Sequence, residues 1–165
     1  GLSQGKKLDV VREFSELARV FISSESELPE ELKPYRLTTD PALIHSVMAE
    51  AELYFGEGAT MAMESVILGT PAVYLNQNWP GYTLEAGKRG LMHNYRLDSA
   101  SIEKAIDKGR QTLANPQVKQ EVSELSREYF EGKIDPTAFL AWFVEQWPES
   151  FAIMKNNPGF QERFI

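Results

Sequence analysis

The sequence contains no cysteine and only two histidines, and these absences narrow the chemistry available to it. Without cysteine there are no disulfides, no thiolate metal ligands and no cysteine nucleophile. Two isolated histidines make a poor zinc site, because structural zinc takes four ligands, mostly from cysteine and histidine. We therefore expect no metal ion and no cofactor, and the lack of cysteine favours a cytoplasmic location.

Positive charge and long apolar runs are scarce as well. The 165 residues carry 17 lysines and arginines against 24 aspartates and glutamates, which gives a net charge of −7. An acidic domain repels the phosphate backbone, so nucleic acid is not an expected partner. No apolar run approaches the ~20 residues of a membrane span, so no transmembrane segment is expected. Hydrophobic residues make up 42% of the chain, the composition of a packed globular domain.

The hydrophobic pattern predicts an alternation of helices and short strands. Alternation of this kind indicates βαβ units, so we expect an α/β fold: a Rossmann-like three-layer domain with a short parallel sheet. Apolar residues at helical spacing predict helices at 8–19, 41–51, 61–68, 101–113, 116–130 and 136–147. Short apolar runs predict strands at 20–22, 35–38, 53–55 and 71–75.

Two expectations about organisation follow from this order of elements. Residues 1–115 are expected to form the nucleotide-binding core, and residues 116–165 a helical C-terminal extension that packs on the core, with a missing N-terminal domain as a further packing partner. A doubly wound domain begins with a strand, whereas the first predicted element is a helix. We therefore expect a first strand upstream of the helix at 8–19.

The stretch from Leu53 to Glu64 carries the strongest functional signal. A predicted strand leads into the small-residue turn Gly56–Thr60, which opens a helix, and the glycines leave room for a ligand. The free amides of a helix start, together with the helix dipole, favour a diphosphate. Glu64 lies four residues after Thr60, on the same side of the helix, where a carboxylate accepts hydrogen bonds from ribose hydroxyls.

This stretch resembles the donor site of GT-B glycosyltransferases and UDP-N-acetylglucosamine 2-epimerases. The pattern Gly-x-Gly-Ala-Thr-Met-x-x-Glu at 56–64 is followed by Leu-Gly-Thr-Pro-Ala-Val at 68–73. It is most similar to an uncharacterised prokaryotic family of predicted glycosyltransferases. The resemblance covers residues 20–113 and is specific between residues 44 and 75.

The resemblance implies that the chain is the C-terminal, donor-binding half of a GT-B fold. A UDP-sugar would then be the ligand, with its diphosphate on Gly58, Ala59 and Thr60 and its ribose on Glu64. Acceptor contacts and the catalytic base would lie in a missing N-terminal domain, so the chain alone is expected to be inactive. No catalytic residue is assigned, and transferase and epimerase remain open alternatives.

Four further residues are candidate contacts for the sugar or the base. The loop 76–85 follows a buried strand, so it is expected at the carboxyl edge of the sheet, where ligands bind. Glu85 has a second interpretation as the start of the next helix, and His45 as a surface residue on the flank of its helix. The four candidates are Gly56, Asn76, Glu85 and His45.

A second functional hypothesis belongs to a different class. Ala59 stands where the resembled family usually has glycine, and its methyl group would crowd the phosphates. The chain would then be a degenerate nucleotide fold that binds protein rather than a nucleotide-sugar. The many apolar residues after Pro148 fit this hypothesis, because an exposed apolar patch usually marks an interface. The aromatic residues between 139 and 147 are most simply core.

Overall fold

In the computed structural model, which describes residues 1–165, the chain divides into two units, Gly1–Arg127 and Glu128–Ile165. We call them unit 1 and unit 2 and describe each by itself. The boundary lies later than the 115/116 boundary expected from the sequence, because most of the sixth helix belongs to unit 1. No helix in either unit combines the length and the apolar character needed to cross a membrane.

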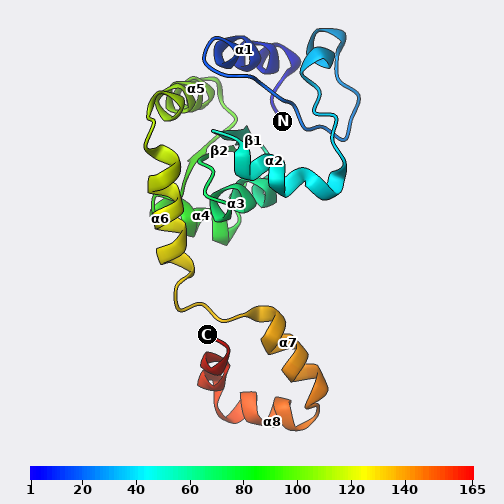
Figure 1. The fold of residues 1–165 in the computed structure, drawn as a ribbon, viewed down its shortest axis with the longest axis vertical. Helices are drawn as coiled ribbons and strands as arrows, with labels where there is room; N and C mark the ends of the chain where they lie inside the picture. Colours follow the sequence, from blue (N-terminus) through cyan, green and yellow to red (C-terminus); the bar gives the residue numbers. More distant parts are fainter. The chain divides into compact units, whose positions relative to one another are not determined.

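Three short parallel strands form the centre of unit 1 (Figure 1). They are β1 (Tyr54–Gly56), β2 (Ala72–Leu75) and β3 (Met92–Tyr95), in the order β1-β2-β3. All four residues of β2 are buried, as its uninterrupted apolar sequence predicts for a central parallel strand. The expected short parallel sheet of an α/β domain is therefore confirmed.

Helices α3 (Ala59–Ile67) and α4 (Gly81–Lys88) connect successive strands and cover one face of the sheet. Both connections advance in the same direction across the sheet, and parallel crossovers are right-handed, so both helices lie on one face. Asn94 of β3 holds α4 there, because its side-chain amide donates to the Thr83 carbonyl oxygen at 2.7 Å. Gly69 ends α3 with a φ of 82°, the left-handed conformation predicted for it.

Helices α5 (Ser99–Ala114) and α1 (Gln4–Ser15) form the layer on the other face. Phe14 of α1 packs edge-on against Phe55 of β1, with ring centroids 5.0 Å apart. Because side chains alternate along a strand, Phe55 and its neighbours on this face point away from α3 and α4. The buried residues at the centre of this layer are Val73, Leu75, Ile102 and Ala105.

The two strands expected before β1 are not formed as strands. Residues 20–22 and 35–38 make one isolated parallel bridge, between Ile22 and Arg36. The 3₁₀ helix η1 (Glu30–Tyr35) runs into the second segment and leaves only the residues after it extended. The prediction of two strands here was therefore wrong, although the single bridge between them is parallel, as expected of the sheet.

Helix starts follow their capping residues more closely than the apolar pattern suggested. α1 begins at Gln4 rather than at residue 8, because the Ser3 hydroxyl oxygen accepts from the Lys6 N–H. Asp40 is the predicted N-cap and accepts from the Ala42 N–H at 2.9 Å. The turn that it caps is the 3₁₀ helix η2 (Pro41–Leu43), and α2 (Ile44–Glu50) follows it.

Neither β3 nor α4 was predicted from the sequence. β3 contains His93 and Asn94, so it lacks the continuous apolar run that identified β2. α4 begins inside the stretch 76–85 that was expected as a loop and extends to Lys88, and only Thr83 and Ala86 are buried in it. Both elements depend on contacts with the rest of the sheet rather than on local pattern.

Helix α6 (Val118–Phe130) begins in unit 1 and ends in unit 2. Its first half packs on unit 1, where Val122 is buried and the Lys119 ammonium donates to the Ala49 carbonyl oxygen at 2.9 Å. This half of the helix therefore belongs to unit 1.

Unit 2 contains α7 (Pro136–Glu145), α8 (Glu149–Asn156) and the 3₁₀ helix η3 (Pro158–Phe164). The aromatic side chains of α7 and η3 contact one another but are not fully buried, and Trp147, which was expected in the core with them, is 59% exposed. The rings in mutual contact are those of Phe139, Trp142, Phe143, Phe160 and Phe164. Ser150 is fully buried, and its hydroxyl donates to the Phe143 carbonyl oxygen and so links α8 to α7.

We predict that Gly109→Ala destabilises unit 1 by about 1–3 kcal/mol. A Cβ at Gly109 would lie 2.6 Å from Phe14 Cζ, so the methyl group would push α1 away from α5 and β1. Urea unfolding followed by circular dichroism measures the loss. Gly5→Ala in α1 is the matched control, because nothing lies within 4 Å of its added Cβ. A Gly109→Ala chain as stable as the control would contradict this packing.

Candidate functional site

The turn after β1 is closed by the Tyr54 side chain, which folds back over it. The Tyr54 hydroxyl donates to the Gly58 carbonyl oxygen at 3.1 Å and accepts from the Gly58 N–H at 3.2 Å. A Cβ at Gly56 would lie 2.7 Å from the tyrosine oxygen, so only glycine allows this closure. The Gly58 N–H is therefore already bonded, although the sequence analysis expected it to face a diphosphate.

The first turn of α3 keeps its remaining amides available. Gly58 is the N-cap and has no side chain, and no other side chain caps this turn. The first helical bond runs from the Ala62 N–H to the Gly58 carbonyl oxygen at 3.0 Å. The N–H groups of Ala59, Thr60 and Met61 precede it and have no partner within the helix. They form a small cluster of donors at the positive end of the helix dipole.

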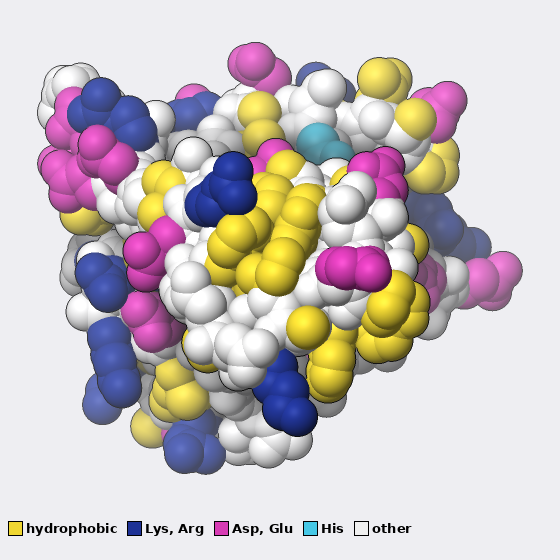
Figure 2. Space-filling model, turned by 90° about the horizontal axis from the view of Figure 1, so that it is seen from below, with side chains coloured by type: hydrophobic (Ala, Val, Ile, Leu, Met, Phe, Trp, Pro, Cys, Tyr) yellow, Lys and Arg dark blue, Asp and Glu magenta, His cyan; other side chains and the backbone are white.

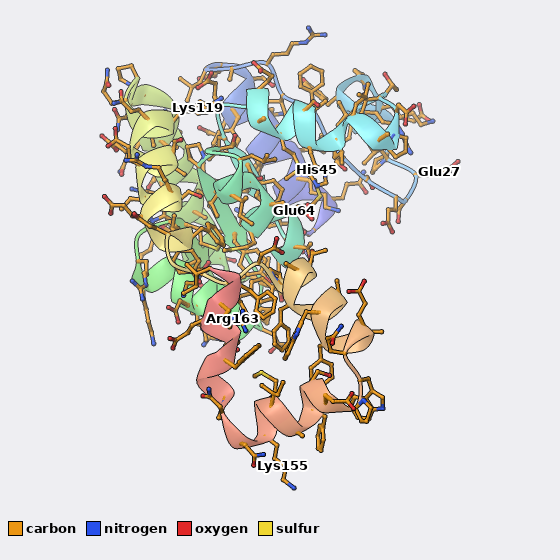
Figure 3. The ribbon with its side chains drawn as sticks, turned by 60° about the horizontal axis from the view of Figure 1, so that its bottom comes forward. Glu27, His45, Glu64, Lys119, Lys155 and Arg163 are labelled. Carbon is orange, nitrogen blue, oxygen red and sulfur yellow. The ribbon has the colours of Figure 1, made fainter.

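Glu64 lies one turn further along α3, and His45 of α2 faces it (Figure 3). The Nε2 atom of His45 is 3.5 Å from the Oε2 atom of Glu64. The side chains of His45 and Glu64 are 60% and 36% exposed, so the pair is open to solvent. The structure thus brings together two residues that the sequence analysis singled out separately.

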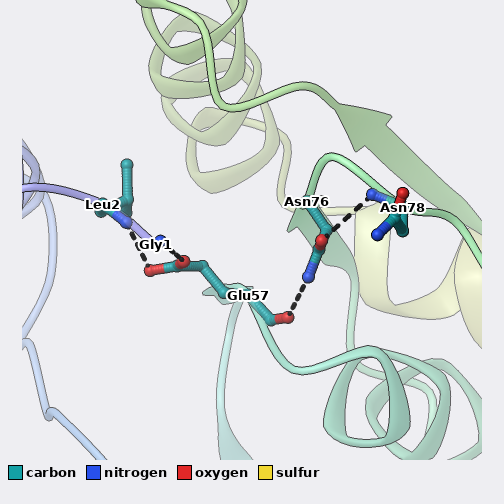
Figure 4. A network of polar contacts seen from close by, with 5 residues as sticks. All are labelled: Gly1, Leu2, Glu57, Asn76 and Asn78. Carbon is teal, nitrogen blue, oxygen red and sulfur yellow. Dashed lines mark hydrogen bonds and ion pairs between the residues drawn. The ribbon is translucent and has the colours of Figure 1, made fainter.

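Asn76 ties the carboxyl ends of all three strands together. Its side-chain amide donates to the Glu57 carbonyl oxygen at 3.2 Å, and its backbone N–H donates to the Tyr95 carbonyl oxygen at 3.0 Å. Its side-chain oxygen accepts from the Asn78 N–H at 3.1 Å (Figure 4). Asn76 lies at the predicted edge, and it has a clear structural role there.

Glu57 joins the same network and was missed by the sequence analysis. Its carboxylate accepts from the Leu2 N–H at 2.9 Å, and the amino group of Gly1 lies 3.7 Å away (Figure 4). The beginning of α1 therefore lies beside the beginning of α3. No local pattern marks Glu57, because its partner is 55 residues away in the sequence.

Arg96 is a further residue of this edge that was missed from the sequence, and it lies beside Trp79 of the loop 76–85. They follow β3 and β2, and the Arg96 guanidinium carbon lies 5.2 Å from the centre of the Trp79 ring. The indole Nε1 of Trp79 is buried without a hydrogen-bond partner. Arg96 could not be placed at the edge from the sequence because β3 itself was not predicted.

The candidate Glu85 and the second histidine of the chain, His93, lie elsewhere in unit 1. Glu85 is inside α4 rather than before it, and its carboxylate is 3.3 Å from the Arg89 guanidinium. His93 of β3 lines a cavity of about 140 Å³ with Pro71 and Gly90, at the amino ends of the strands. Burial lowers the pKa of His93, and the Lys108 charge lowers it further. This cavity is at the opposite edge of the sheet from the turn after β1.

No group of three or more histidine, aspartate or glutamate side chains is arranged to hold a metal ion. No protein-family model, curated protein or solved structure matches this chain. The interpretation of the site therefore depends on its own geometry: the open start of α3, the His45–Glu64 pair and the network around Asn76.

We predict that Tyr54→Phe flattens the alkaline pH dependence of stability. Burial raises the pKa of Tyr54 to about 12, against about 10 in an unfolded chain. Between these values the unfolded chain releases a proton that the folded chain keeps, so the unfolding free energy falls as the pH rises. The variant lacks this contribution. Urea unfolding of both chains across that pH range measures the difference, and parallel profiles would show that the Tyr54 hydroxyl is not buried.

Proposed function

We propose that unit 1 binds the nucleotide of a sugar-nucleotide donor, a UDP-sugar by preference, at the carboxyl edge of its sheet. The observation that carries the proposal is the uncapped first turn of α3, which follows β1 directly. In parallel α/β sheets ligands bind at this edge, and helix starts bind phosphate groups through their amides. The N–H groups of Ala59 and Thr60 are the proposed diphosphate donors.

Glu64 is the proposed ribose ligand. It lies one helical turn beyond the phosphate donors, on the same side of α3 as Thr60. His45 approaches the Oε2 atom of its carboxylate, which leaves Oε1 able to accept hydrogen bonds from ribose hydroxyls. His45 then orients the carboxylate. Asn76 holds the turn through its hydrogen bond to the Glu57 carbonyl oxygen, and Gly56 leaves room for the Tyr54 hydroxyl that closes it.

Positive charge at this edge supports the phosphate assignment within an otherwise acidic chain. Arg96 follows β3 at the same edge, and its guanidinium is held against the Trp79 ring. In a transferase or a 2-epimerase-like enzyme, the α3 amides would stabilise negative charge as the diphosphate leaves the sugar. Acceptor contacts and the catalytic base would come from a second domain, as the resemblance to GT-B proteins implies.

We predict that unit 1 binds UDP and UDP-N-acetylglucosamine and that Glu64→Ala weakens this binding by about 1–3 kcal/mol, the range for a hydrogen-bonded charged group. Isothermal titration calorimetry of the whole chain measures both affinities. Glu85→Ala is the matched control, because Glu85 is also a helical glutamate beside a basic partner. Equal affinity of the wild type and both variants would show that Glu64 does not contact the nucleotide. No binding at millimolar ligand would contradict the proposed function.

A pair of substitutions at Ala59 tests the helix amides directly. Ala59 is the first residue of α3, where proline is well accepted, and the extended Gly58 (ψ 110°) suits a following proline. Ala59→Pro removes one N–H donor and is expected to lower UDP affinity about tenfold, which is the effect expected from the loss of one hydrogen bond. Ala59→Gly keeps the donor and removes the methyl group, so its affinity is expected to equal or exceed that of the wild type.

Calorimetry with UDP gives both results at Ala59, and circular dichroism confirms that α3 is retained. Full affinity in the Ala59→Pro chain would show that the start of α3 does not bind phosphate. Weaker binding by Ala59→Gly would contradict crowding by the methyl group.

A second candidate function is protein binding without a nucleotide. The observation that favours it is a set of exposed apolar side chains on unit 2, among which Val144 is 71% exposed. Figure 2 shows hydrophobic side chains gathered on the face seen from below. The exposed residues of α7, α8 and their connection are Leu140, Val144, Trp147, Phe151 and Ile153. A flat UDP titration would favour this function over nucleotide binding.

A further inference from the structure

The cavity at the amino ends of the strands lies at the edge of the sheet opposite to the start of α3. Its lining comes from the start of β2, the turn before β3, the second half of α5 and the first half of α6, so it belongs wholly to unit 1. Its volume is about 140 Å³. A cavity of roughly this size accommodates benzene in another protein, so a ligand of about six non-hydrogen atoms fits here.

His93 reaches this cavity from the sheet. It pairs with Val73 of β2, and laterally paired residues of neighbouring strands point to the same face. Val73 packs in one cluster with Ala105 of α5, so His93 faces α5 as well. Lys108 comes three residues after Ala105 and lies on the same side of the helix, where it lines the cavity with His93. The sheet and α5 thus each contribute one basic side chain to the same wall.

These two basic groups are close enough to act on each other. Burial lowers the pKa of His93, and the Lys108 charge lowers it further, which requires the ammonium to lie near the imidazole. Neither side chain forms an ion pair with a carboxylate. Glu121, on the α6 side of the cavity, accepts from the Asn115 side-chain amide at 3.3 Å and does not shift the pKa of His93. The protein therefore leaves the positive charge at this wall unbalanced.

The rest of the lining is largely apolar. Leu91 is fully buried beside the basic pair, and Val118 and Val122 of α6 lie across from it. An inorganic anion would meet the charge but leave this apolar surface without a partner. An anion with a short aliphatic chain would cover both, because burial of apolar surface is favourable. The lining thus favours an organic anion.

We propose that this cavity binds a small aliphatic carboxylate. The carboxylate lies between His93 and Lys108, and the chain lies against Leu91 and Val122. The bound anion offsets the Lys108 charge, so it favours protonation of His93 and gains a second charge-assisted hydrogen bond. The site is independent of the proposed nucleotide site, because the two lie at opposite edges of the sheet and share no residue.

The test is a titration of the whole chain with sodium butyrate, followed by NMR at the His93 ring and the Gly90 amide. Saturable shifts with a Kd of about 10 mM or tighter are expected for a ligand of this size. Saturation is expected to raise the pKa of His93, and the affinity is expected to rise as the pH falls through that pKa.

Two further probes separate the charge from the chain. Butylamine has nearly the same size with the opposite charge, and it is expected to cause no saturable shift. Inorganic phosphate has the charge without the chain, and it is expected to bind about tenfold more weakly than butyrate. Saturable binding of butylamine, or binding of phosphate as tight as that of butyrate, would overturn the proposal.

Lys108→Gln tests the basic pair and is expected to weaken butyrate binding about tenfold, through loss of one charge-assisted hydrogen bond. Lys104→Gln is the matched control, because Lys104 is one turn earlier on α5, is exposed and does not line the cavity. Circular dichroism shows whether both variants keep their helices. Equal affinity in the two variants, or no saturable shift in the wild type up to about 100 mM butyrate, overturns the proposal.

Discussion

The pairing of β2 with a parallel strand on each side is the constraint on which the rest of unit 1 depends. Its register sets Gly56 opposite Tyr74 and Leu75 opposite Tyr95, so all three strands end at one level. The turn after β1, Asn76 and Arg96 therefore lie along one edge, although they are far apart in the sequence. The two hydrogen bonds of Asn76 to its neighbours then fix that edge. A shift of this register would move the site residues apart even if each of them kept its own conformation.

The two hydrogen bonds between the Tyr54 hydroxyl and Gly58 change how the glycines of the turn are interpreted. From the sequence, Gly56 and Gly58 indicated space for a ligand. In the structure the absence of a side chain at Gly56 leaves room for the Tyr54 hydroxyl, and the Gly58 N–H donates to that hydroxyl. These glycines have a structural explanation and add little to the argument for a nucleotide. Support for nucleotide binding therefore comes from the open amides of Ala59 and Thr60 and from the carboxylate of Glu64 one turn away.

The sequence predicted elements whose signals are local and missed those that depend on distant contacts. Continuous burial identified β2, and Asp40 and Gly69 marked helix ends through their own conformations. β3 was missed because its partly buried and polar residues are stabilised by β2 and α4 rather than by an apolar run. For the site, the turn and Glu64 were predicted, and His45 was a candidate without a partner. Glu57 and Arg96 could not be found, because each acquires its place only when the strands align.

The nucleotide site and the start of α1 meet at the same edge but are held by different contacts. The start of α3 is held by β1, by the Tyr54 hydroxyl and by Asn76. The start of α1 is held by the Glu57 carboxylate, through Leu2 and the amino group of Gly1, and by packing of the Leu2 side chain on the core of unit 1. Loss of the Glu57 contacts would therefore loosen the beginning of α1 without removing the α3 amides that are proposed to bind the diphosphate.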